Sequence, residues 1–297
     1  LTHRIAALRA LSTHDNAHSS SGYWMLTGVP HQPKNTENAK VGFPNDWPSL
    51  AAVNRIARGN TPGMPASLVL PEHIWNTGGI SWPGQDAGFM GRTNDPWLLH
   101  CMPHEQGFAL PGVTLPTEVA APRLSDRVAL SRNLDATERQ LERLGEGPGL
   151  FQKQQETALN LVQSGAARRA FRLEEEPESL RDRYGRNRWG QQLLLARRLA
   201  EAGVEIITSS LSGPLCGRVN NWDDHAVNQH QFEALRFRMP TYDRCVSALI
   251  EDIYDRGLDK DVMVIATGEF GRTPKINTQV GTQTKVTQPG RDHWPNA

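Results

Sequence analysis

The fold is decided by a short stretch that starts with a helix-ending glycine, Gly203-Val204-Glu205-Ile206-Ile207-Thr208-Ser209-Ser210-Leu211. Its β-branched residues predict a strand over residues 204–211. Upstream, apolar side chains recur at helical spacing from about Ser179 to Ala200, which predicts a helix that stops at Gly203. A helix followed at once by a strand is the repeating unit of a parallel α/β sheet.

The residues downstream continue the same alternation. Apolar residues from Phe232 to Ile253 recur at alternating threes and fours, which predicts a core-facing helix, kinked or restarted at Pro240 and ended by Gly257. Val262-Met263-Val264-Ile265-Ala266 is apolar on both faces and predicts a fully buried strand. We therefore expect an α/β fold with a largely parallel sheet flanked by helices.

We expect the whole chain, residues 1–297, to form one domain with two portions. Loop signals of Gly, Pro, Asn and Trp dominate residues 1–122, and loops of this kind often form binding surfaces over a rigid core. Residues 123–297 form the expected helix and strand core. Its first part predicts one helix from the apolar face of Leu124, Val128, Leu134, Leu141 and Leu144, and a second from Phe151 to Ala167.

Two regular elements are predicted inside the loop-rich portion. Ser67-Leu68-Val69-Leu70 has the composition of a short strand, and Pro71 ends it. Tyr23 to Gly28 predicts the end of a helix that closes with the glycine.

Composition excludes several classes of function. Hydrophobic residues make up 38% of the chain and charged residues 22%, the range of a globular protein with a buried core. No apolar run is long enough to span a membrane. The 32 basic and 32 acidic side chains cancel, which argues against nucleic acid or an anionic bilayer as partner. A small anionic substrate needs only a local positive site.

The cysteines are isolated in the sequence, and both chain ends have unusual features. Cys101, Cys216 and Cys245 lack paired spacing, so we expect small buried hydrophobes and no disulfide framework or thiolate zinc site. The chain opens at Leu1 without a methionine or leader and closes just after a motif rich in ligand-type residues. We therefore expect a fold truncated at both ends.

Reactive side chains follow both predicted strands, where an open α/β sheet binds its ligands. Asn221-Trp222-Asp223-Asp224-His225 comes after the strand 204–211, and Thr267-Gly268-Glu269-Phe270-Gly271-Arg272-Thr273-Pro274 comes after 262–266. A further loop carries Gly290-Arg291-Asp292-His293-Trp294-Pro295. Each segment alone favours a cap, a turn or a surface hydrogen bond, whereas the three together favour a site.

These residue types are those of a divalent metal site. Asp223 and His225 lie two apart, so both side chains project to the same side of an extended segment. A carboxylate with a neutral imidazole is a common ligand pair for zinc or another divalent ion. His293 offers a third ligand and Glu269 a carboxylate for an adjacent ion. Two ions about 3.5–4 Å apart would clamp the attacking and leaving oxygens of a displacement at phosphorus or sulfur.

A second dense polar cluster precedes the predicted helix that ends at Gly28. It is His14-Asp15-Asn16-Ala17-His18-Ser19-Ser20-Ser21-Gly22. Serine and histidine at a helix start are typical of a nucleophile and a metal ligand, and equally of an N-cap. The residues alone are compatible with both interpretations, a catalytic site and a helix cap.

Several long motifs, spread over nearly the whole chain, carry a resemblance to a known family. They are the segments 267–274 and 290–295 quoted above, His18-Ser19-Ser20-Ser21-Gly22 leading to Leu26-Thr27-Gly28, Gln85-Asp86-Ala87-Gly88-Phe89-Met90-Gly91, Tyr184-Gly185-Arg186-Asn187 and Trp222-Asp223-Asp224-His225. These strings resemble the bacterial family catalogued as domain of unknown function 1501. That family is placed in the alkaline phosphatase superfamily, alongside sulfatases and metal-using phosphoglycerate mutases.

The resemblance implies an alkaline-phosphatase-like fold and a set of metal ligands. Asp223, His225 and His293 resemble the first metal set of the superfamily. Glu269 stands where the superfamily has an Asp-His pair, and Phe270 in the second position departs from it. The implied cofactor is a divalent metal, zinc, manganese or calcium.

The resemblance also implies catalytic positions. His18 and Ser19 fall near the nucleophile of the superfamily, and counting back from Thr27-Gly28 favours His18, which is not the usual serine, threonine or formylglycine precursor. His18 or Ser19 would act as nucleophile, ligand or proton carrier. Arg272 would offset charge on the substrate oxyanion.

The function that follows is metal-dependent hydrolysis of a phosphate or sulfate ester, with a small anionic substrate such as a sulfated or phosphorylated saccharide. One alternative is an exported non-catalytic metal-binding or scaffold protein that keeps the fold. A second is a phosphomutase or transferase acting at the same site. Members of the family typically carry an export signal, so the resemblance implies a periplasmic or otherwise exported protein.

Overall fold

A computed structural model gives the structure of the chain. It describes residues 1–60, 63–76, 79–109, 164–212, 222–282 and 284–296. The helices predicted over residues 123–144 and over most of 151–167 lie outside these residues, as does Cys216.

A small parallel sheet forms the centre of the fold. Strand β1 (Ser67–Leu70) lies between β4 (Trp97–Leu98) and β5 (Ile206–Ser209), and both neighbours run parallel to it. All four residues of β1 are buried. The strands predicted at 67–70 and within 204–211 are thereby confirmed, and their parallel pairing agrees with the expected sheet.

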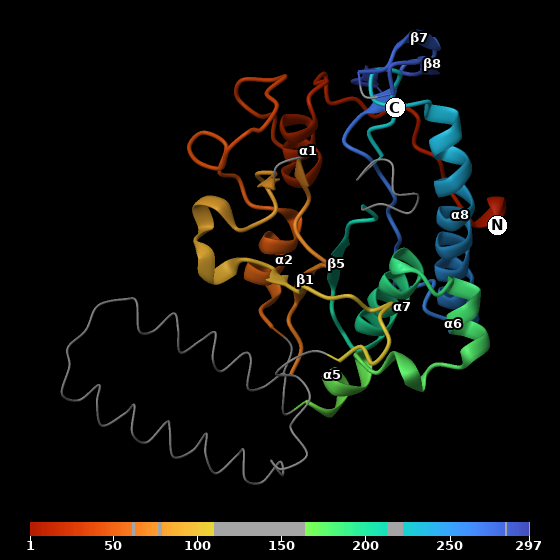
Figure 1. The fold of residues 1–297 in the computed structure, drawn as a ribbon. Coiled ribbons are helices and arrows are strands. Elements are labelled where there is room, and N and C mark those ends of the chain that lie inside the picture. The colour runs from red at the N-terminus through yellow and green to blue at the C-terminus, as the bar shows by residue number, and fades with distance from the viewer. Residues whose placement is uncertain (61–62, 77–78, 110–163, 213–221, 283, 297) are drawn as a thin grey trace.

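Helices flank this sheet on both sides (Figure 1). Helix α2 (Leu50–Arg58) packs on one side, and α7 (Arg188–Glu201) on the other, backed by α6 (Glu178–Tyr184) and α8 (Gln231–Asp255). The remaining helices are α1 (His18–Thr27), α5 (Gly165–Ala170), η1 (Thr2–Arg4), η2 (Gly88–Met90), η3 (Arg92–Asn94) and η4 (Leu173–Glu175).

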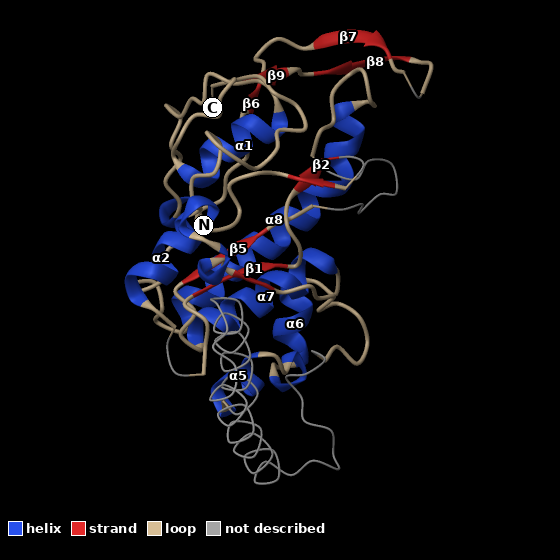
Figure 2. Ribbon diagram, turned by 90° about the vertical axis from the view of Figure 1, so that its left-hand side faces the viewer, coloured by secondary structure: helices blue, strands red, loops and turns tan. Residues whose placement is uncertain are grey.

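Three two-stranded antiparallel pairs lie away from the parallel sheet (Figure 2). They are β2 (Trp75–Asn76) with β3 (Ile80–Ser81), β6 (Gly271–Arg272) with β9 (His293–Trp294), and β7 (Asn277–Val280) with β8 (Thr287–Gly290). The fold of the described residues is therefore mixed helix and strand around a small parallel sheet.

The helix predicted from Ser179 to Gly203 is two helices. Helix α6 ends at Gly185, whose φ of +97° is a left-handed conformation that favours glycine. Asn187 then caps α7, its side chain accepting a hydrogen bond from the backbone N–H of Gly190. The prediction of one continuous helix is therefore wrong at this point, because Gly185 and the Asn187 cap divide it.

Helix α8 continues through Pro240 and does not restart there. It ends at Asp255, two residues before Gly257, which has a φ of +68° and agrees with the predicted stop. The helix predicted to close at Gly28 is also confirmed, because α1 ends at Thr27 and Gly28 adopts the left-handed conformation.

Buried ion pairs hold α6, α7 and α8 together around an apolar core. Arg197 on α7, 1% exposed, contacts Glu176 at 2.7 Å and Asp252 of α8 at 2.8 Å. Tyr184 of α6 donates a hydrogen bond to the same Asp252 carboxylate at 2.9 Å. Removing one partner of such a buried pair leaves a charge uncompensated, which costs about 3–5 kcal/mol.

The strand predicted at Val262-Met263-Val264-Ile265-Ala266 is wrong. The segment is extended, but no described strand pairs with it, and no described residue forms a hydrogen bond with the backbone of 263–266. It returns from the end of α8 toward the C-terminal strands (Figure 1) with Met263 80% and Ile265 71% exposed. An apolar run predicts burial only when a neighbouring strand or helix covers it.

Two other expectations concern the cysteines and the membrane-spanning segments. Cys101 and Cys245 are free thiols, and burial raises the pKa of Cys101 to about 12 and that of Cys245 to about 11. Among the described residues, none of the helices has the length and apolar character needed to cross a bilayer.

The exposed segment 262–266 is expected to promote self-association. An extended, uncharged apolar segment with unpaired backbone groups is a template for strand pairing between molecules. The double substitution Met263→Lys with Ile265→Lys should therefore lower light scattering at high protein concentration. Its thermal midpoint should stay unchanged, because both side chains lie in solvent.

Leu50→Lys is the matched control, since Leu50 is 65% exposed but lies on helix α2 and not in a segment without strand partners. It should scatter light as the wild type does. Equal scattering by the double variant and the wild type would contradict the assignment of 262–266 as the associating edge.

Candidate metal centre

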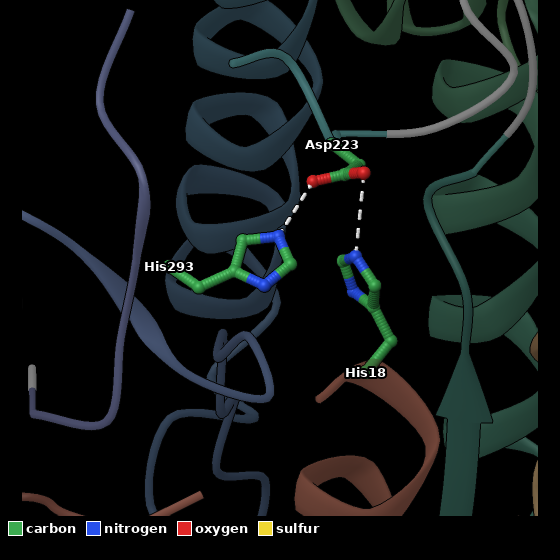
Figure 3. Close-up of side chains that lie close together, drawn as sticks. All are labelled: His18, Asp223 and His293. Carbon is green, nitrogen blue, oxygen red and sulfur yellow. Dashed lines mark hydrogen bonds and ion pairs between the residues drawn. The ribbon is translucent and has the colours of Figure 1, made fainter. Parts of the chain in front are cut away.

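Three side chains from distant parts of the sequence converge on one point (Figure 3). They are His18 at the start of α1, Asp223 in the loop before α8, and His293 on β9. Asp223 lies 3.3 Å from His18 Nε2 and 2.9 Å from His293 Nε2. One ligand-type atom from each residue lies within 4.8 Å of the other two.

His18 is placed by the acidic residues around the start of α1. The Asp15 carboxylate accepts hydrogen bonds from the backbone N–H of Ala17 and from Ser20 Oγ, both at 2.9 Å. Glu37 accepts the backbone N–H of His18 at 2.8 Å. Carboxylates are favourable at this end of a helix because they satisfy N–H groups without an intrahelical partner. His18 therefore stands on a fixed helix start.

Asp223 is placed by its neighbour Asp224. Asp224 is buried and forms an ion pair with Arg238 of α8, which is fully buried. Gln229 donates a hydrogen bond to the Asp224 carboxylate at 2.7 Å. The backbone N–H of Asp224 also donates to the Trp222 carbonyl at 2.8 Å, so Asp223 sits in a tight turn beside the anchored Asp224 and faces the two imidazoles.

His293 and Arg272 face each other across the β6–β9 pair. Arg272 Nη2 donates to Asp223 at 2.9 Å, which places a guanidinium beside the cluster. Gly290, just before β9, lets the C-terminal strands approach the Asp223 loop, because a Cβ there would lie 2.2 Å from the backbone nitrogen of Ala226. The antiparallel register thus brings both residues to Asp223.

Both imidazoles of the cluster are held by the nitrogen that faces away from it. His293 Nδ1 donates to the backbone carbonyl of Asn16 at 2.7 Å. His18 Nδ1 lies 2.7 Å from the Glu269 carboxylate. In each ring Nε2 is left pointing toward Asp223. Histidines that bind metals are usually oriented in this way, by an acceptor on the second nitrogen.

The other predicted site residues lie around this cluster. His225 Nε2 is 3.3 Å from Asp223 Oδ2, the oxygen that His18 also contacts, and His225 Nδ1 is 3.9 Å from Asp292. Glu269 contacts His18 and is not one of the three grouped ligands. Ser19 is fully buried, and its hydroxyl donates to Thr36 O and accepts the backbone N–H of Ala39.

Sequence reasoning did not identify the residues that support the ligands. Asp15 lies three positions before His18, and Asp224 directly follows Asp223, but the motifs that contain them do not indicate a supporting role. The repeated acidic residue in Asp223-Asp224 was a usable signal, because adjacent side chains diverge and only one of the two can face the centre. The group of Asn16 that orients His293 is a backbone carbonyl, so the residue type at this position does not reveal it in the sequence.

Charge is balanced within the cluster. Burial raises the pKa of Asp223, but hydrogen bonds from His18, His225 and His293 and the charge of His18 outweigh this and hold it well below its usual range. Burial lowers the pKa of His18, and Asp223 and Glu269 outweigh that effect and raise it to about 10. Without a metal ion, His18 is thus protonated at neutral pH.

Comparison with known proteins gives a family and no characterised relative. The family model described as "Protein of unknown function (DUF1501)" matches residues 1–297. Neither the curated proteins nor the solved structures contain a match.

The raised pKa of His18 predicts a pH-dependent stability of the metal-free protein. A raised folded-state pKa contributes stability that is full below about pH 6.5, the unfolded value, and is lost as the pH rises through about 10. In a chelating buffer, the urea midpoint of the wild type should therefore fall more steeply between pH 6.5 and 10 than that of His18→Gln.

His14→Gln is the control, because His14 belongs to the same polar tract and is exposed. Its midpoint should follow the wild-type curve. Parallel curves for His18→Gln and the wild type would show that His18 gains no charge partner on folding.

Proposed function

The chain belongs to the DUF1501 family of proteins of unknown function, and from that premise we propose that it is a metal-dependent hydrolase of phosphate or sulfate esters. The observation that carries the proposal is the convergence of His18, Asp223 and His293 on one point. Its alkaline-phosphatase-like architecture, and its export from the cytoplasm, belong to the same proposal and rest on the resemblance of its motifs.

The donor set fits a divalent ion. Two imidazole nitrogens and a carboxylate oxygen form a common ligand set for zinc, and the combination also accepts manganese. Ligand bonds of about 2.0–2.2 Å in a tetrahedral site separate the ligand atoms by about 3.4 Å. The contacts of Asp223 with His18 and His293, at 3.3 and 2.9 Å, are close to that spacing. His225 lies 3.3 Å from the same Asp223 oxygen as His18, whereas His293 contacts the other oxygen.

The surroundings suit an anionic substrate. Arg272, next to Asp223, offers a guanidinium that matches the oxygens of a phosphate or sulfate group. A divalent ion bound here would polarise the ester oxygen and lower the pKa of a bound water. His18 and His293 would hold that ion through their fixed Nε2 atoms. Arg272 would offset the charge that develops on the oxyanion.

A second candidate is a metal-binding protein without turnover. Two observations favour it. The Ser19 hydroxyl is buried and bonded to the backbone of Thr36 and Ala39 rather than to any residue of the cluster. The ring of Phe270 lies against both imidazoles, with centroids 4.3 Å from His293 and 5.0 Å from His18, and fills space beside the ligands.

Metal binding is the first test. Chelator-treated protein titrated separately with zinc, manganese and calcium should bind at least one of them tightly. Asp223→Asn and His18→Gln should each weaken the binding on the order of 100-fold or more, beyond the effect of losing an outer-shell partner. His3→Gln, a histidine outside the cluster, should bind as the wild type does. Weak binding of all three ions by the wild type would remove the metal centre.

Turnover is the second test, on the metal-loaded protein. A panel of phosphate monoesters, phosphate diesters and sulfated saccharides should include a substrate whose hydrolysis Arg272→Ala slows on the order of 100-fold, because one oxyanion donor is lost. Metal without any turnover would support the non-catalytic candidate. Transfer to an added alcohol in preference to water would support a mutase or transferase.

A further inference from the structure

We propose that Glu269 is a positioning residue that fixes the ring of His18, so that Nε2 faces the cation and Nδ1 keeps its proton. This inference rests on the proposed metal centre and gives Glu269 a different role from that of a ligand. The contact that carries it is the 2.7 Å distance between His18 Nδ1 and Glu269 Oε1.

The two nitrogens of His18 face two different carboxylates. Nε2 lies 3.3 Å from Asp223, within the cluster, whereas Nδ1 faces Glu269 outside it. An imidazole cannot offer both nitrogens to one ion, so the nitrogen bonded to Glu269 is not the ligating one. A carboxylate that accepts the Nδ1–H of a ligating histidine fixes its tautomer and makes Nε2 a stronger donor.

Glu269 is itself held by the helix that carries His18. Ser21 Oγ donates to the backbone carbonyl of Glu269 at 2.6 Å, and Thr13 Oγ1 lies 2.7 Å from Ser21 Oγ. Ser21 follows His18 by three positions, so both side chains lie on one face of α1. One face of α1 therefore contacts Glu269 twice: Ser21 binds its backbone carbonyl, and His18 binds its carboxylate.

His293 provides the parallel case within the same site. Its Nδ1 donates to the Asn16 carbonyl, and its Nε2 faces Asp223. The backbone therefore orients His293, whereas a side chain orients His18, and only the latter arrangement can be changed by substitution. Phe270, which follows Glu269 directly, rests on both rings and limits their rotation.

The test uses long-range proton–nitrogen NMR to determine which nitrogen of His18 carries a proton and which binds metal, with and without zinc. In zinc-loaded wild type, His18 should show a ligated Nε2 and a slowly exchanging Nδ1–H. Glu269→Ala should lose that protected proton and bind zinc 10- to 100-fold more weakly. Glu269→Gln retains an amide oxygen that accepts the Nδ1–H, so it should restore the proton and most of the affinity. His18→Gln assigns the signals.

Glu37→Gln is the matched control, because Glu37 accepts the backbone N–H of His18 and does not touch its ring. It should leave the Nδ1–H signal in place. Equal loss of zinc by Glu269→Gln and Glu269→Ala, with no His18 Nδ1–H in the zinc-loaded wild type, would overturn the proposal in favour of Glu269 as a ligand.

Failure of the metal centre itself gives a different result. Metal-free wild type should already show the protected Nδ1–H, which Glu269→Ala removes. If that signal is present but no zinc binds, the contact stands and the proposed function fails, and with it the role of Glu269 toward a cation. If the signal is missing from the metal-free protein, the contact itself is refuted.

Discussion

The candidate site depends on one carboxylate. Asp223 is contacted by His18, His225 and His293 through their Nε2 atoms and by the guanidinium of Arg272. A carboxylate that is four-fifths buried is costly unless cationic or hydrogen-bonding partners surround it. These partners come from α1, from the loop before α8 and from the β6–β9 pair, so satisfying Asp223 requires the ends of the chain to meet.

The scaffold brings these segments together by burying charge rather than by apolar packing alone. Arg197 joins α7 to α8 through Asp252, and Arg238 joins α8 to the site loop through Asp224. Buried pairs of this kind add little net stability compared with apolar residues of the same size, but they are strongly directional. Here Arg238 engages Asp224, and the adjacent Asp223 is the carboxylate that faces the imidazoles.

Much of the scaffold followed from the sequence, and the exceptions have physical causes. Strand β1 and the ends of α1 and α8 were predictable because Pro71, Gly28 and Gly257 impose local conformations. The predicted helix from Ser179 to Gly203 is divided because Gly185 adopts a positive φ and Asn187 caps a new helix, and the spacing of apolar residues reports neither effect. The segment 262–266 was misassigned because apolar composition shows a preference for burial and cannot show which neighbour provides it.

The site was predictable as a set of residues but not as a geometry. Spacing placed Asp223 and His225 on one side, yet the structure puts His18 rather than His225 in the compact group with Asp223 and His293. His18 and Asp223 are separated by most of the chain, and the register between β6 and β9, which sets His293 against Arg272, is a tertiary property.

The centre is charge-balanced before any ion enters, and this constrains how an ion can bind. Protonated His18 and Arg272 balance the carboxylates of Asp223 and Glu269, so a divalent cation must replace the proton on Nε2 of His18 to reach Asp223. Glu269 and the Asn16 carbonyl hold the opposite nitrogens of the two histidines and need not move in this exchange. The arrangement therefore permits a proton to be exchanged for a metal ion with the rings already in place, which keeps the reorganisation required for binding small.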